Sequence, residues 1–124
     1  MKIVDRLFGW LLVVGALLHA GGSWTGYRNT PELLLWALSG SLAALLLAAV
    51  NLLRVSRPDD RELAWVSFGG CLAWIAVALG FGKVIGNVFD PRALIHAINA
   101  VVLAAMSLRT VLRTTNHGVP NVAA

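Results

Sequence analysis

Four long stretches of this sequence contain no charged side chain. They run from Leu7 to Trp24, from Leu33 to Leu53, from Leu63 to Phe81 and from Ala93 to Leu108. A helix that crosses a hydrocarbon core needs about 20 apolar residues, so the first three stretches are long enough. The fourth becomes long enough when it continues past Arg109, whose long side chain can reach the membrane surface. The pattern predicts an all-α membrane protein with four transmembrane helices.

The composition supports the same class of protein. Of the 124 residues, 58% are hydrophobic and 13% are charged, whereas an ordinary soluble domain is about 25% charged. One small soluble core does not bury that much apolar surface, so the expected partner is the lipid bilayer. The net charge of +4 would suggest nucleic-acid binding in a soluble protein. Here the charges flank the apolar stretches, and no nucleic-acid partner is predicted.

The basic residues divide unequally between the two sides of such a bundle, and the positive-inside rule places the richer side in the cytoplasm. The prediction is an antiparallel bundle, N-in/C-in, in a bacterial inner membrane. A secretory signal peptide at the N-terminus is the less favoured alternative. The side of the termini carries Lys2, Arg6, Arg54, Arg57, Arg61, Arg109 and Arg113, and the outer side carries Arg28, Lys83 and Arg92.

Helix boundaries follow from capping residues and prolines. Pro31 and Pro91 each suit a first helical position, and the aspartates at 59 and 60 suit the cap of the third helix. The expected helices cover about residues 5–24, 31–54, 61–82 and 91–113, within a transmembrane domain of residues 1–115. Residues 116–124 are predicted to form a polar cytoplasmic tail.

The two halves of the chain resemble each other weakly. Trp10 and Gly15 align with Trp65 and Gly70, and the prolines that begin the second and fourth helices also align. Two parallel helical-hairpin repeats would explain the matches. Chance similarity between helices rich in alanine and leucine explains them equally well.

Two histidines lie inside the apolar stretches at similar depths, about 5 and 8 Å below the outer surface at 1.5 Å per helical residue. Polar residues inside a membrane are candidates for function by default. In the repeat alignment each histidine is opposite a tryptophan, and an asparagine lies one turn deeper. The predicted ligand-binding residues are His19, His96, Trp36, Trp74 and Asn99, below an outer basic rim of Arg28, Lys83 and Arg92. The alternative is that each histidine only joins neighbouring helices by a hydrogen bond.

Three functions fit these features. The first is an accessory or ligand-binding subunit, for a lipid or a quinone, with a polar and aromatic pocket near the outer face. The second is a b-type haem protein in which His19 and His96 are the metal ligands, Gly15 leaves room for the macrocycle and the rim neutralises the propionates. No other metal site and no catalytic residue set is predicted, so an enzyme is not expected.

The third function is a small oligomeric transporter or channel. In length and helix number the chain resembles the small multidrug resistance transporters and the fluoride channels. It lacks the membrane-embedded glutamate of the former, because the stretch from Leu7 to Trp24 has no carboxylate, and it has no Thr- and Phe-rich pore motif of the latter. A homo-oligomer or a subunit of a larger membrane complex is expected. The inner half is predicted to be almost purely apolar packing, so that any function opens outward.

Overall fold

The computed structural model describes residues 2–116, which fold into four helices without a strand. The four-helix bundle predicted from the sequence is therefore confirmed. Each helix is long and apolar enough to cross a membrane, which indicates an integral membrane protein. Residues 117–124, most of the predicted tail, lie outside the described residues. The helices are α1 (Lys2–Tyr27), α2 (Pro31–Ser56), α3 (Arg61–Val84) and α4 (Pro91–Asn116).

The helices begin where capping chemistry places them. Pro31 and Pro91 are the first residues of α2 and α4, and the side chain of Asp60 accepts a hydrogen bond from the backbone N–H of Leu63 at 2.9 Å. The helices end two or three residues beyond the spans expected from the sequence, at Tyr27, Ser56, Val84 and Asn116. The reason is that the expected spans were limited by apolar character, whereas helical hydrogen bonding continues through the polar ends.

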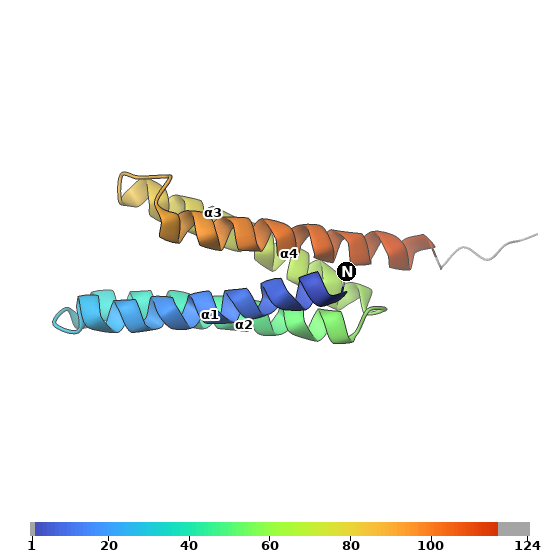
Figure 1. Ribbon diagram of the computed structural model, residues 1–124, viewed down its shortest axis with the longest axis horizontal. Coiled ribbons are helices and arrows are strands. Elements are labelled where there is room, and N and C mark those ends of the chain that lie inside the picture. The colour runs from blue at the N-terminus through green and yellow to red at the C-terminus, as the bar shows by residue number, and fades with distance from the viewer. Residues whose placement is uncertain (1, 117–124) are drawn as a thin grey trace, which may run out of the picture.

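Two helical hairpins make up the bundle (Figure 1). Helix α1 packs along α2, and α3 packs along α4, more extensively than the hairpins pack on each other. The start of α1 and the end of α4 lie at one end of the bundle, here called the terminal end. The loops of residues 28–30 and 85–90 lie at the other end, here called the loop end, and the hairpins diverge toward it (Figure 1).

Small side chains form most of the interior. Ala16, Ala44 and Ala48 are buried around Leu12 and Leu103, which are both fully buried. Small residues let helix backbones approach closely in lipid, where no hydrophobic force drives helices together. Large apolar side chains lie on the outside instead, as expected of surfaces that face acyl chains.

Candidate functional site: a histidine layer and a buried polar network

His19 on α1 is held by a hydrogen bond to α2. Its Nδ1 lies 2.8 Å from the hydroxyl oxygen of Ser41, and that hydroxyl lies 3.2 Å from the carbonyl oxygen of Ala37, to which it donates. Which of the two groups donates in the His19–Ser41 contact depends on the tautomer of the imidazole, since a neutral ring carries its proton on Nδ1 or on Nε2.

His96 on α4 reaches across the bundle to α1. A Cβ atom added to Gly15 would lie 3.2 Å from Cε1 of the His96 ring, so the ring rests directly against the α1 backbone. The centroids of the His96 and His19 rings are 6.3 Å apart, with the planes at 88°. The Trp74 ring, from α3, lies 5.8 Å from the His96 ring at 72°. His19, His96 and Trp74 thus form one group, here called the histidine layer.

Trp74 contributes an unpaired hydrogen-bond donor to this layer. Its Nε1 is buried and has no hydrogen-bond partner among the described residues. An indole nitrogen can only donate, so it needs an acceptor. A buried donor without a partner costs about 1–3 kcal/mol. The layer therefore gains stability from any acceptor that reaches this N–H.

Asn99 is buried next to the layer and joins α4 to α1. In the amide orientation that satisfies both of its groups, its nitrogen donates to the carbonyl oxygen of Phe8 at 3.0 Å and its oxygen accepts from the backbone N–H of Leu12 at 3.1 Å. Both partners belong to the α1 backbone. Both polar groups of the Asn99 side chain therefore hydrogen-bond α4 to α1.

Trp36 lies apart from the other predicted ligand-binding residues. Its side chain is 71% exposed on the outer surface of α2, as is expected of a residue in contact with lipid. Ser41, which the sequence prediction did not name, is the α2 residue that contacts the layer. Ser41 lies five positions after Trp36, so the two project in different directions from the helix.

The residues of the predicted basic rim differ in their surroundings. Arg28 and Lys83 are exposed near the loop end. Arg92 donates from Nε to one carboxylate oxygen of Asp90 and from Nη2 to the other, both at 2.9 Å. These hydrogen bonds lower the pKa of Asp90 from 3.8 to about 2. The charge of Arg92 is already balanced by Asp90.

The space that the sequence assigned to a haem macrocycle is occupied in this structure. Gly15 lies against the imidazole of His96 itself, with Cε1 and Nε2 the nearest ring atoms. His19 and His96 remain the two residues with haem-ligand chemistry. Their helices would have to separate for a macrocycle to enter. Among residues 2–116 no group of three or more metal-binding side chains is found.

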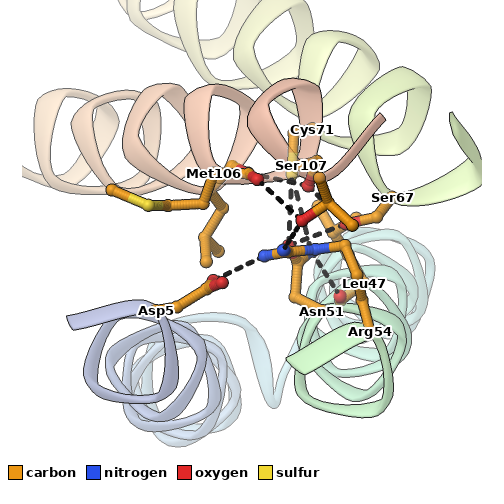
Figure 2. Close-up of polar contacts among 10 residues, drawn as sticks. Asp5, Leu47, Asn51, Arg54, Ser67, Cys71, Met106 and Ser107 are labelled. Carbon is orange, nitrogen blue, oxygen red and sulfur yellow. Dashed lines mark hydrogen bonds and ion pairs between the residues drawn. The ribbon is translucent and has the colours of Figure 1, made fainter. Parts of the chain in front are cut away.

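A second polar group, which the sequence interpretation missed, lies near the terminal end (Figure 2). Arg54 on α2 is 1% exposed and contacts Asp5 on α1, with Nη2 2.5 Å from a carboxylate oxygen. Its Nη1 donates to the hydroxyl of Thr110 on α4 at 3.2 Å. From the sequence, Arg54 was placed at the end of the second helix, among the basic residues on the side of the termini, and the turn of this side chain into the bundle was not anticipated.

Uncharged polar side chains extend the network across α2, α3 and α4. The Ser67 hydroxyl donates to Oδ1 of Asn51 at 2.8 Å and lies 2.8 Å from the Ser107 hydroxyl. The Asn51 amide nitrogen donates to the carbonyl oxygen of Leu47 at 2.9 Å and lies 3.5 Å from Sγ of Cys71. The inner half was predicted to be almost purely apolar, and this network shows that prediction to be wrong.

The sequence did hold a signal for this network. Asn51 and Arg54 are three positions apart, as are Ser107 and Thr110, so each pair shares a helix face. Ser67 interrupts the third apolar stretch at a similar distance from the terminal end. Polar residues that interrupt three apolar helices at a similar depth favour hydrogen bonds between those helices.

Fold and polar contacts together define the class: a four-helix bundle with candidate transmembrane helices and polar groups buried between them. Comparison with protein-family models, with curated proteins and with solved structures finds no match to the chain.

Proposed function

We propose that this protein is a non-catalytic membrane subunit that binds an apolar, carbonyl-bearing molecule of the quinone class in the histidine layer. The observation that carries the proposal is the buried indole N–H of Trp74, which has no acceptor among the described residues and whose ring packs against His96. A quinone carbonyl oxygen supplies the missing acceptor.

The remaining chemistry of the layer suits such a ligand. The Ser41 hydrogen bond occupies Nδ1 of His19, and Nε2 remains for a second polar contact. The rings of His19, His96 and Trp74 offer flat surfaces on which a flat, neutral ring can pack. A quinone is apolar and reaches such a site through the bilayer.

We further propose that the terminal end faces the cytoplasm and that the membrane is the bacterial inner membrane. Six arginines and one lysine on that side, against two arginines and one lysine on the other, support this orientation. The large apolar side chains around the outside also fit contacts with further copies or with larger subunits of a membrane complex.

The test measures binding of decylubiquinone to the full-length protein in lipid nanodiscs, with empty nanodiscs as the reference for partitioning into lipid. Trp74→Phe keeps the aromatic ring but removes the N–H donor. It is expected to weaken binding about 5- to 30-fold, the loss that follows from one hydrogen bond of about 1–2 kcal/mol. Trp36→Phe is the matched control, because Trp36 lies on the outer surface, and it is expected to bind like the wild type.

Equal binding by the wild type and Trp74→Phe would reject the proposal, as would binding no greater than that of empty nanodiscs. The two alternatives give different signals in the same preparations. A Soret band after haem-replete expression, lost in His19→Ala and in His96→Ala, would replace the quinone by haem b. Ion or solute flux into liposomes that requires either histidine would favour a transporter instead.

A further inference from the structure

A basic pocket opens at the terminal end, on the opposite side of the bundle from the histidine layer. Its volume is about 510 Å³, and it lies between the start of α1, the end of α2 and the last turns of α4. Four of its lining side chains are cationic and two are carboxylates. These six are Lys2, Arg54, Arg109, Arg113, Asp5 and Asp59.

The charges of this pocket do not balance. Asp5 is paired with Arg54, so the two cancel. Lys2, Arg109 and Arg113 make no ion pair with another described residue, and only Asp59 opposes them in the lining. The pocket therefore carries excess positive charge, which favours an anionic ligand.

Arg54 lines this pocket, and its guanidinium is held in position. Asp5 and Thr110 accept hydrogen bonds from its two terminal nitrogens, and the side chain is 1% exposed (Figure 2). Its Nε is buried without a hydrogen-bond partner in the described part of the chain. A buried cation is expensive in a membrane protein, and a second anion beside it would lower that cost.

We infer that this pocket binds a phosphoryl group. Arginine is the side chain best matched to phosphate oxygens, through its planar set of donors. The pocket lies at the helix ends, at the level of lipid head groups, and Val55 and Met106 add an apolar wall beside the cations. The phosphoryl group belongs either to an anionic phospholipid in the adjacent leaflet or to soluble phosphate, and the pocket's chemistry fits both sources.

The experiment compares full-length variants of equal net charge. Arg109→Gln with Arg113→Gln removes two rim cations and leaves the Arg54–Asp5 pair intact. Arg28→Gln with Lys83→Gln removes two exposed cations from the loop end and is the matched control. Each protein is taken from nanodiscs that contain one-fifth phosphatidylglycerol in phosphatidylcholine, and the retained lipid is counted by native mass spectrometry. Thermal unfolding in a neutral detergent, with inorganic phosphate or with chloride at equal ionic strength, forms the second arm.

The wild type and the loop-end control are expected to retain phosphatidylglycerol, and the Arg109/Arg113 variant to bind it about 30-fold more weakly, at about 1 kcal/mol for each cation near an anionic surface. Selective stabilisation by phosphate that the same variant loses would identify soluble phosphate as the source. Lipid retention without phosphate stabilisation would identify the phospholipid. Equal retention of lipid and equal response to phosphate in all three proteins would overturn the inference.

Discussion

At the scale of the residue, the buried Arg54–Asp5 ion pair joins α1 to α2. Asp5→Asn leaves the buried Arg54 guanidinium without a counter-charge and is expected to lower the free energy of unfolding by about 2 kcal/mol. This is less than the 3–5 kcal/mol typical of a fully buried pair, because the Asp5 side chain keeps 12% of its exposure and the adjoining pocket admits water. Unfolding by sodium dodecyl sulfate in mixed micelles measures the change.

Two further variants complete this test. Asp5→Asn combined with Arg54→Gln removes both charges and is expected to recover at least half of the lost stability. Asp59 lines the same pocket, but its carboxylate is exposed and forms no ion pair with another described residue, so Asp59→Asn is expected to change stability by less than about 0.5 kcal/mol. If Asp5→Asn proved no more harmful than Asp59→Asn, the pair would not contribute to the fold.

Single residues also show where sequence reasoning fails in a membrane bundle. The repeat alignment grouped Trp36 with Trp74, but only Trp74 turns toward the interior. In a soluble helix the polar face identifies the side that is exposed to solvent. Here both faces of each helix are apolar, so the sequence gives little indication of which side chains point into the bundle. For the same reason Arg54 was placed at a helix end by its charge, and the direction of its side chain into the bundle was missed.

At the scale of the elements, Asp90 stabilises the start of α4 in a pH-dependent way. Its carboxylate accepts hydrogen bonds from the backbone N–H and the side chain of Arg92. Because its pKa falls from 3.8 to about 2 in the folded protein, the stabilisation is complete above about pH 4 and is lost as the pH falls toward 2. The melting temperature of the wild type is expected to fall across this interval more steeply than that of Asp90→Asn.

Arg92→Gln separates the two causes of that effect. It removes the side-chain hydrogen bonds, which lower the pKa of Asp90 most, but keeps the backbone hydrogen bond. Its pH dependence is expected to lie between those of the wild type and Asp90→Asn. Parallel melting curves for all three proteins from pH 5 to pH 2 would show that Asp90 does not contribute.

Gly82 lets the α3–α4 connection pack closely against the end of α3. A Cβ atom at Gly82 would lie 3.1 Å from Cα of Val88 and 3.2 Å from the carbonyl oxygen of Asn87, and these backbone atoms cannot rotate away. Gly82→Ala is therefore expected to destabilise the protein by about 1–3 kcal/mol. Gly80, one half-turn earlier, has no atom within 4 Å of its added Cβ, so Gly80→Ala is expected to be neutral or stabilising by up to about 1 kcal/mol. Chemical unfolding of both variants measures the two changes in the free energy of unfolding. Equal changes would contradict the close packing at Gly82.

The elements themselves were the most predictable part of the molecule. Proline cannot donate a backbone hydrogen bond and is tolerated at a first helical position, so Pro31 and Pro91 marked two helix starts directly. The helix ends were less predictable, since polar residues such as Thr25 still bond within the helix, here to the carbonyl oxygen of Gly22 at 2.9 Å.

At the scale of the whole molecule, the two ends of the bundle carry different chemistry. The histidine layer, with its unpaired indole donor, belongs to the half where the hairpins diverge (Figure 1). The charged network and the basic pocket belong to the half where all four helices are joined by polar contacts. A charged contact between the hairpins, from Arg54 to Thr110, therefore lies at the terminal end.

The orientation of the bundle in the membrane determines from which side ligands reach the histidine layer and the basic pocket. Cysteines introduced at exposed loop positions, as Asn29→Cys and Asp59→Cys, mark the loop end and the terminal end respectively. A membrane-impermeant maleimide applied to intact spheroplasts is expected to label Asn29→Cys at once and Asp59→Cys only after permeabilisation, because the positive-inside rule retains the terminal end in the cytoplasm. The wild type is the control, since its single cysteine, Cys71, is fully buried. The reverse labelling pattern would place the basic pocket outside, and an anionic phospholipid bound there would come from the outer leaflet.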